Sequence, residues 1–173
     1  MRNLAVLMLL DDGFSCYTML VINNTPRKHM TRQFRITIAA SALKSSVATG
    51  WAASISEGFD TMGELSDWEP SITMNEALLT GIIRCLLEVP VGSEVEIISN
   101  NAYIIDGLGK YLLVWRSNGW RKSDGKPIAH KELWQQVDAL LLSQQAIKAT
   151  YQDDGLVRQL FKIAKTARTK MDL

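Results

Sequence analysis

The chain has 173 residues, of which 47% are hydrophobic, and its formal net charge at pH 7 is +1. This length suits one well-buried core better than two, because domains usually run to roughly 100–150 residues. The near-neutral charge excludes binding of nucleic acid through overall charge, so any such binding must come from local clusters of basic side chains.

Cysteine usage and the amino-terminal composition bear on the compartment. Cys16 and Cys85 lie in unrelated sequence contexts, which fits reduced thiols better than a disulfide framework or a metal site. The apolar segment at residues 4–10 is too short to span a membrane, and it runs into Asp11 and Asp12, which makes it a poor signal peptide. We therefore expect a cytoplasmic protein that does not enter a membrane, and we expect it to be a monomer.

The first half of the chain predicts two strands and a helix. Residues 34–38 (FRITI) alternate between polar and apolar side chains, and residues 50–55 (GWAASI) form a second strand candidate, so an antiparallel pair is expected. Apolar side chains recur at helical spacing over residues 75–88, which predicts a nearly buried helix. Pro90 and Gly92 end that helix.

The second half predicts two more strands and three helices. Residues 94–99 (EVEIIS) alternate as a strand, and residues 102–115 follow as a helix despite two glycines. A further helix is expected at residues 131–144, a short strand at residues 146–151, and a last helix from residue 155 to about residue 170. Strands that alternate with helices predict an α/β fold, with a mixed sheet and helices packed on its faces.

The most specific pattern in the chain begins at Trp115. Residues 115–141 (WRSNGWRKSDGKPIAHKELWQQVDALL) are similar to the segment of bacterial ribonuclease HI that carries its substrate-binding basic protrusion and the helix after it. An ordered match of this kind does not arise readily by chance. The matching residues are Trp115, Gly119, Trp120, Asp124, Lys126, Pro127, Leu133, Trp134, Gln135 and Asp138.

Three upstream segments extend the resemblance. Residues 99–103 (SNNAY) stand where the family has a strand that ends in an aspartate, followed by Ser, a polar residue and Tyr. Residues 75–78 (NEAL) stand where the family's glutamate opens its first long helix, and residues 50–53 (GWAA) match its Gly-Tyr-Gly-Ala strand. The chain thus resembles type 1 ribonuclease H over roughly residues 30–168, which implies the ribonuclease H-like fold, a mixed sheet of about five strands flanked by helices.

The same register places the family's amino terminus at Met30, because residues 30–41 (MTRQFRITIAAS) match the first dozen residues of a ribonuclease HI. We therefore expect residues 30–170 to form the ribonuclease H-like domain and residues 1–29 to lie outside the fold. Residues 1–29 are either a genuine extension or untranslated upstream sequence that was included because the start codon was assigned too early, and both alternatives stay open.

The chemistry that the resemblance implies depends on four carboxylates. The family's enzymes cut the RNA strand of an RNA–DNA hybrid with two Mg²⁺ ions about 3.5–4 Å apart, and such hard cations need anionic oxygen ligands. The first carboxylate position is Ala39, in an Ala-Ala-Ser that replaces the family's Asp-Gly-Ser, and the third is Asn100, whose amide offers one neutral oxygen. Loss of two anions weakens the attraction for Mg²⁺ by several kcal/mol, even at an effective dielectric constant of about 20.

The other two positions leave a remnant catalytic and metal-binding site open. Glu76 matches the second position, but Thr73-Met-Asn-Glu76 is also a capping box, and the two roles are compatible. The fourth position falls on Asp154 if the last helix is matched from its start, or on Phe161 if it is matched from its end. Asp154 also suits the N-cap of that helix, which is the interpretation that we favour.

Other parts of the family's machinery are altered as well. The loop that carries a catalytic histidine is missing between Tyr151 and Gly155, and His130 matches a phosphate-contacting position instead. Ile72 and Thr73 replace the paired asparagines with which the family reads the minor groove of the hybrid. Recognition of the RNA strand is therefore in doubt.

The binding side of the resemblance is better retained. Residues 110–131 contain six basic residues and one acidic residue, a local charge of about +5 that suits salt-sensitive contacts to phosphates. We expect Trp115 and Trp134 to lie in the core, and Trp120, Arg121 and Lys122 to be exposed. The resemblance assigns nucleic-acid contacts to Tyr111, Arg116, Trp120, Arg121, Lys122, Lys126, His130 and Lys131.

Three hypotheses about function remain. The leading one is a catalytically inactive ribonuclease H-like protein that binds an RNA–DNA hybrid, a duplex or a protein partner through the retained protrusion. The second is an active or weakly active ribonuclease H that hydrolyses the RNA strand with Mg²⁺, using Glu76, Asp154, Asn100 and Asp153. The third is an interaction module that binds no nucleic acid, and salt-sensitive binding would distinguish the first hypothesis from it.

We predict that deleting residues 1–29 leaves the fold intact, because Met30 begins the recognisable domain and residues 4–10 have no designated partner strand. The truncated protein should melt at nearly the same temperature as the full chain when both are followed by circular dichroism. A large drop would show that the deleted segment packs into the core.

Overall fold

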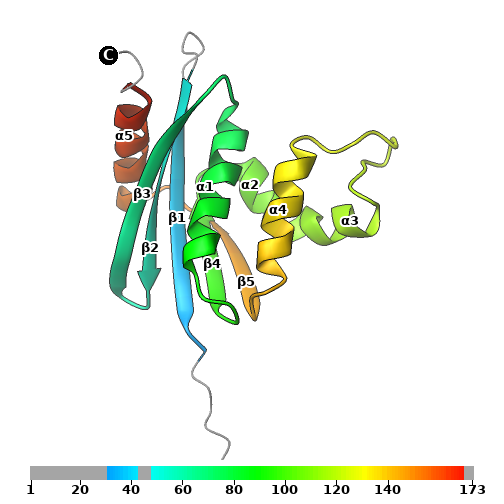
Figure 1. The fold of residues 1–173 in the computed structure, drawn as a ribbon, viewed down its shortest axis with the longest axis horizontal. Coiled ribbons are helices and arrows are strands. Elements are labelled where there is room, and N and C mark those ends of the chain that lie inside the picture. Colours follow the sequence, from blue (N-terminus) through cyan, green and yellow to red (C-terminus); the bar gives the residue numbers. More distant parts are fainter. Residues whose placement is uncertain (1–30, 43–47, 170–173) are drawn as a thin grey trace, which may run out of the picture. The chain divides into compact units, whose positions relative to one another are not determined.

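The computed structural model describes residues 31–42 and 48–169, so the prediction about residues 1–29 concerns a segment outside the described residues. A five-stranded mixed sheet has the order β3-β2-β1-β4-β5, and helices cover both of its faces, as predicted (Figure 1). The strands are β1 (Gln33–Ala42), β2 (Ala48–Glu57), β3 (Asp60–Pro70), β4 (Glu94–Ser99) and β5 (Ala146–Tyr151).

Strand direction divides the sheet into two halves. β2 pairs antiparallel with β1, as the sequence predicted, and also with β3, whereas β4 pairs in parallel with β1 and with β5. Parallel neighbours need a crossover, and helices α1 (Met74–Glu88) and α4 (Lys131–Leu141) lie within these crossovers on one face of the sheet. The carboxyl ends of β4 and β5 therefore lie at the same edge, at Ser99 and Tyr151.

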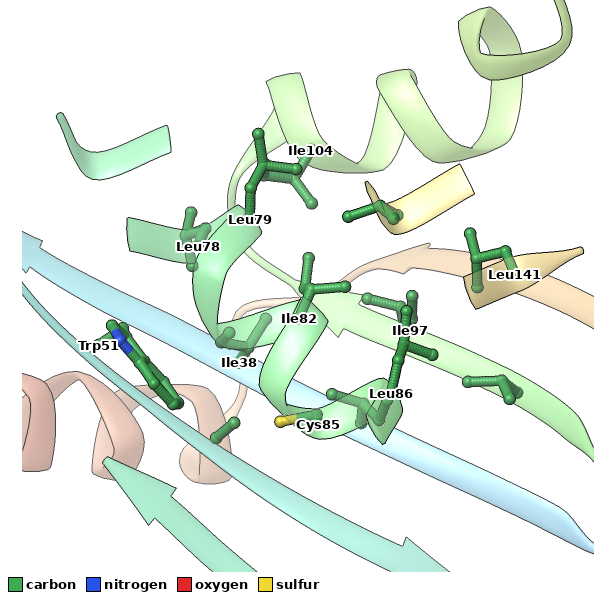
Figure 2. Close-up of a cluster of buried hydrophobic side chains, with 14 of the residues drawn as sticks. Ile38, Trp51, Leu78, Leu79, Ile82, Cys85, Leu86, Ile97, Ile104 and Leu141 are labelled. Atoms are coloured by element: carbon green, nitrogen blue, oxygen red, sulfur yellow. The ribbon is translucent and has the colours of Figure 1, made fainter. Parts of the chain in front are cut away.

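Helix α1 packs closely on the sheet because its inner face is apolar. Its buried leucines and Ile82 lie in the main core with Ile38 of β1 and Trp51 of β2 (Figure 2). Gly81 permits the approach, since a Cβ there would lie 2.6 Å from Ile38 Cδ1 and 2.7 Å from the Trp51 ring. Cys85 is buried in the same cluster, and burial raises the pKa of its thiol to about 12, so it acts as core filler.

The helix predicted at residues 102–115 consists of three consecutive segments. These are α2 (Ala102–Asp106), a π-helical segment (Gly107–Tyr111) and α3 (Leu112–Ser117). Gly107 is needed where this helix meets α4, because a Cβ would lie 2.4 Å from the Trp134 ring. Trp134 is fully buried, as predicted.

Helix α5 (Gly155–Thr169) covers the opposite face of the sheet (Figure 1). A Cβ at Gly50 on β2 would lie 2.1 Å from the carbonyl oxygen of Ala164, so the helix backbone lies directly against the strand. Where the helix backbone lies this close, the strand side chains beneath it must be small, as Ala39 and Ala52 are. The buried side chains between α5 and the sheet form a second cluster made of Ala39, Ala52, Ile98, Val157, Leu160 and Ala164.

The sequence predicted two strands before α1, whereas the structure has three. The missed strand, β3, lies at the edge of the sheet, and most of its side chains are exposed. Its sequence, DTMGELSDWEP, contains four acidic residues and no Val or Ile. An exposed edge strand needs no apolar alternation, so the period of two was absent from the sequence.

None of the described helices is long and apolar enough to cross a membrane.

Candidate functional site

The first carboxylate position is closed to solvent. Ala39 lies on β1 with no exposed surface, and its methyl group belongs to the apolar cluster beneath α5. Val157 and Leu160, from the first two turns of α5, belong to the same cluster. A carboxylate at this position would leave water for apolar surroundings, which costs several kcal/mol unless a partner compensates it.

The third position, Asn100, follows β4 and is exposed. The next residue, Asn101, caps α2 by accepting the N–H of Ile104 at 3.2 Å. Its Nδ2 donates to Asn75 Oδ1 at the start of α1, at 3.0 Å. Neutral amides thus tie the amino ends of α1 and α2 together, at the edge of the sheet where the resemblance expects an aspartate.

The second position, Glu76, is occupied by a capping interaction. Its Oε2 accepts the N–H of Thr73 at 2.7 Å, and its own N–H donates to Thr73 Oγ1 at 3.2 Å, which completes the capping box expected from the sequence. The Thr73 N–H is the main cause of a lowered pKa for the Glu76 carboxyl, with further help from His130. The carboxylate stays ionised at neutral pH, but one of its oxygens is already engaged.

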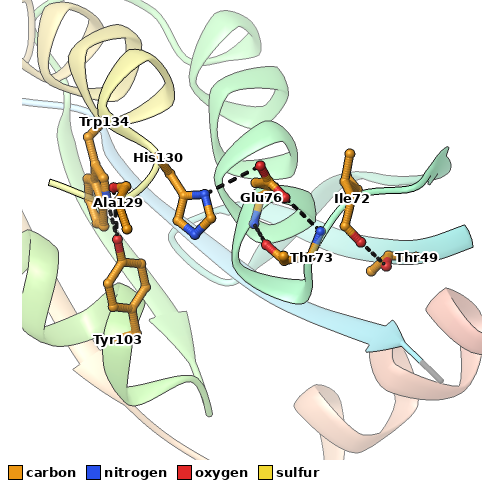
Figure 3. A network of polar contacts seen from close by, with 8 residues as sticks. All are labelled: Thr49, Ile72, Thr73, Glu76, Tyr103, Ala129, His130 and Trp134. Atoms are coloured by element: carbon orange, nitrogen blue, oxygen red, sulfur yellow. Dashed lines mark hydrogen bonds and ion pairs between the residues drawn. The ribbon is translucent and has the colours of Figure 1, made fainter. Parts of the chain in front are cut away.

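His130 faces the other oxygen of Glu76. Its Nδ1 lies 3.4 Å from Glu76 Oε1, which is an ion pair when the imidazole is protonated (Figure 3). The residue begins α4 in a left-handed conformation, with φ of 55°, and only 17% of its side chain is exposed. This orientation turns the ring toward α1, so the phosphate contact that the resemblance implies would compete with the contact to Glu76.

Asp154 forms the N-cap that we favoured for α5. Its Oδ1 accepts the N–H of Val157 at 2.9 Å, and its Oδ2 accepts a bond from Gln152 Nε2. The Val157 N–H is the main cause of its lowered carboxyl pKa. Phe161, the alternative occupant of the fourth position, has a 43% exposed side chain and no metal-binding atom.

These four positions do not fit a pair of Mg²⁺ ions. One supplies a methyl group, one a neutral amide, and the two remaining carboxylates already accept hydrogen bonds from backbone N–H groups. Among the residues that the structure describes, no group of three or more His, Cys, Asp or Glu side chains could hold a metal. The donor set at this edge of the sheet lacks the anionic oxygens that Mg²⁺ prefers.

Residues 118–130, which we call the basic loop, connect α3 to α4. Arg121 and Pro127 form an antiparallel bridge, and the Lys122 N–H donates to the Lys126 carbonyl at 2.8 Å. The Arg121 guanidinium donates to the Gly125 carbonyl at 2.7 Å, which folds the side chain over the turn. Arg121, Lys122 and Lys126 are exposed, so the loop presents three cations from a defined backbone.

Arg116, in contrast, has a structural role that the sequence did not reveal. Its Nε donates to Asp138 Oδ2 at 2.9 Å, and its Nη2 donates to Asp138 Oδ1. The Asp138 side chain is only 7% exposed, and the two-point geometry is typical of a strong pair. The guanidinium joins α3 to α4 and is 37% exposed, so the nucleic-acid contact assigned to Arg116 stays a prediction beside this structural role.

Trp120 also differs from the sequence prediction. It is half-buried, has φ of 63°, and packs against the main core, so it is less exposed than the sequence predicted. Trp115 is half-buried rather than fully buried, and its ring stacks on that of Tyr111 with centroids 5.7 Å apart. The two rings line a pocket of about 270 Å³ beside the basic loop. Its lining residues are Tyr103, Tyr111, Trp115, Lys122, Ile128 and Ala129.

Tyr103 belongs to the matched segment at residues 99–103, but the sequence predicted no role for it. The Tyr103 hydroxyl accepts a hydrogen bond from Trp134 Nε1 at 2.9 Å and donates to the Ala129 carbonyl at 3.2 Å (Figure 3). It therefore fastens the end of the basic loop to α2 and α4. The SNNAY match located the tyrosine, but its partners lie 26 and 31 residues away along the chain. Only the tertiary fold could reveal this contact.

The fold and this arrangement of positions define a ribonuclease H-like domain. The family model for RNase H matches residues 35–152, so the chain belongs to the RNase H family. The ribonuclease H of Thiobacillus denitrificans is 39% identical over 93 residues, which are 54% of this chain and 62% of that protein. The ribonuclease H of Rhizobium johnstonii is 36% identical over 90 residues, which are 52% of this chain and 59% of that protein. The matched part thus spans about three fifths of these curated relatives.

Solved structures of low sequence identity show the same fold. LC11-RNase H1, solved in complex with an RNA/DNA hybrid, superimposes with a TM-score of 0.63 at 18% identity, covering 81% of this chain and 99% of that one. LC9-RNase H1, described as a type 1 RNase H with the type 2 active-site motif, gives a TM-score of 0.62 at 18% identity, covering 81% and 74%. The recognition of a type 1 ribonuclease H fold from the sequence is confirmed.

We predict that Arg116→Ala lowers the free energy of unfolding by about 2 kcal/mol or more, because it leaves the buried Asp138 carboxylate unpaired. The matched control, Arg121→Ala, should change it by about 0.5 kcal/mol or less, since Arg121 is exposed in a turn. Urea denaturation of both variants measures the difference. Equal effects would show that Arg116 does not hold α3 to α4.

Proposed function

We propose that this protein is a nucleic-acid-binding member of the RNase H family that does not hydrolyse RNA–DNA hybrids. The carrying observation is Ala39, which offers no ligand atom and is fully buried beneath α5. The side chains clustered with Ala39 are all apolar, so among the described residues this cluster supplies no carboxylate in its place.

The two remaining carboxylates support the same proposal. Glu76 and Asp154 each satisfy backbone N–H groups at a helix start, so a metal ion would have to compete with hydrogen bonds that stabilise α1 and α5. A cap of this type contributes about 1 kcal/mol to stability. With Ala39 and Asn100 at the other positions, the charge needed to offset that competition is absent.

The basic loop supports the binding half of the proposal. Arg121, Lys122 and Lys126 are exposed, and the aromatic pocket with Tyr111 at its rim lies beside them. Cations beside an aromatic surface suit a nucleic-acid backbone, because phosphates neutralise the cations while sugars or bases pack on the rings. Contacts of this kind bind without reading sequence, so hybrid and duplex are both acceptable partners.

A second candidate function is a ribonuclease H of low activity that uses Mg²⁺. Two observations favour it: the curated relatives that match the chain are named ribonuclease H, and the Glu76 carboxyl retains a lowered pKa and hence its charge. Asp153 and Asn100 are both exposed and would have to complete the site.

An interaction module without nucleic-acid binding is the third possibility. A protein partner, the monomeric state and the cytoplasmic location remain predictions from the sequence.

We predict that the purified protein does not cleave an RNA–DNA hybrid above background with Mg²⁺ or Mn²⁺, because Ala39 removes a metal-bridging carboxylate. Gel analysis of a hybrid labelled on its RNA strand measures cleavage, with an authentic type 1 ribonuclease H as positive control. Metal-dependent cutting that disappears in Glu76→Ala would establish the second candidate instead.

Restoration of the lost aspartates provides a sharper version of this test. The double variant Ala39→Asp/Asn100→Asp should still fail to cut, since the catalytic-histidine loop is absent and the new carboxylate at position 39 would be buried against Val157 and Leu160. The same variant should unfold at lower urea concentration than Asn100→Asp alone, because only position 39 is buried.

We predict salt-sensitive binding of a short hybrid or duplex through the basic loop. The charge reversal Arg121→Glu/Lys122→Glu should remove most of the binding seen near physiological salt, because each phosphate contact contributes a counterion-release term. Fluorescence anisotropy over a salt series measures the affinity and its slope, and circular dichroism checks the fold. If neither affinity nor slope changes, the basic loop is not a nucleic-acid grip.

A further inference from the structure

Helix α5 carries a one-sided charge that the candidate site does not use. It contains Arg158, Lys162, Lys165 and Arg168 and no acidic residue, although the whole chain has a net charge of only +1. Arg168 is buried, whereas the other three side chains are exposed. Mixed signs are the norm on protein surfaces, so a helix with cations only is unusual.

The three exposed cations lie on one line. They are spaced by four and then three residues, which places them on the same face of a helix with about 3.6 residues per turn. The buried side chains of α5, among them Val157, Leu160 and Ala164, face the sheet. The basic stripe (Arg158, Lys162 and Lys165) therefore lies on the exposed side of α5. Helix α5 itself covers the face of the sheet opposite to α1 and α4 (Figure 1).

The described part of the protein does little to neutralise this stripe. Arg158 lies 3.6 Å from Asp153, but both side chains are about half exposed or more, and such pairs contribute little. Lys162 and Lys165 form no ion pair with any described residue. Phe161, next to the stripe, exposes 43% of its side chain. A row of weakly neutralised cations beside an aromatic ring is the arrangement already seen at the basic loop.

We propose that the basic stripe of α5 is a second contact surface for the phosphate backbone of nucleic acid, separate from the basic loop. The stripe spans about 10 Å, since seven residues rise about 1.5 Å each. A duplex presents one negative charge per about 1.7 Å of its axis, so about six phosphates lie along that length. An acidic polypeptide chain has at most one charge per about 3.3 Å, so it matches the stripe less well.

The stripe also begins close to the candidate site. Arg158 lies one turn beyond Asp154, and α5 starts four residues after β5 ends. The amino-terminal end of the stripe therefore lies near Asp154 along the chain. Binding of nucleic acid at the stripe requires no hydrolysis of RNA, and it does not require that the basic loop binds nucleic acid as well.

The test uses two variants of the full chain with equal change in net charge. Lys162→Gln/Lys165→Gln removes two positive charges from the stripe, and Gln159→Glu/Thr166→Glu adds two negative charges on the exposed flank of the same helix. Anisotropy with a duplex of about 24 base pairs and with the matching hybrid, over roughly 20–200 mM salt, gives the affinity and the salt slope. We expect the first variant to lower the slope by about two and to weaken binding at least about tenfold at low salt, and the second to leave the slope unchanged.

The outcomes separate this inference from the proposed function. If the stripe variant loses binding while Arg121→Glu/Lys122→Glu binds normally, the stripe is a contact surface for nucleic acid and the basic loop is not. If both stripe-helix variants weaken binding equally with no change of slope, only long-range charge acts and the inference is overturned. Wild-type protein that ignores both nucleic acids but binds polyglutamate through Lys162 and Lys165 would also overturn it, in favour of an acidic polypeptide.

Discussion

The contact between α5 and β2 constrains the rest of this structure. A Cβ at Gly50 would lie 2.1 Å from the Ala164 carbonyl oxygen, so the helix backbone lies as close to the strand as a glycine permits. Side chains beneath the helix are correspondingly small, with alanines at positions 39 and 52. The alanine at the first carboxylate position and the apolar packing beneath α5 thus depend on each other, because the close approach of the helix requires a small side chain there. An aspartate at position 39 would face Val157 and Leu160 rather than a water-filled site.

On the other face of the sheet, a network of polar contacts holds the basic loop. Tyr103 joins Trp134 to Ala129, His130 faces Glu76, and Glu76 closes the capping box with Thr73. Neutral hydrogen bonds contribute about 1 kcal/mol each, and those to charged groups contribute somewhat more. The supports of the basic loop therefore do not depend on a carboxylate at position 39 or 100, because they belong to α1, α2 and α4.

The sequence predicted most of the fold, but little of the geometry around the candidate site residues. Periodicity located α1, β4 and α5, and the segment at residues 115–141 identified the family, because local patterns encode both. β3 was not predicted from the sequence, because an acidic edge strand lacks the alternation of apolar side chains. Arg116 and Trp120 were assigned to the surface because a basic or aromatic residue in a turn-rich segment gives no sign of a distant partner. Their partners, Asp138 and the main core, appear only once α3 and α4 are packed.

Electrostatics explains why this site is internally consistent without the family's metal ions. Carboxylates gathered around two Mg²⁺ ions repel one another whenever the metal is absent, so they lower stability unless the ions are bound. Ala39 and Asn100 remove two of these charges, and Glu76 and Asp154 gain stabilising partners at helix starts instead. Functional sites are where proteins usually violate local rules of packing and charge. Here the metal-site positions obey those rules, whereas the weakly compensated cations of the basic loop and of α5 violate them. That contrast supports the proposed contacts of the two cationic surfaces with nucleic acid, since uncompensated charge is what a polyanionic partner would neutralise.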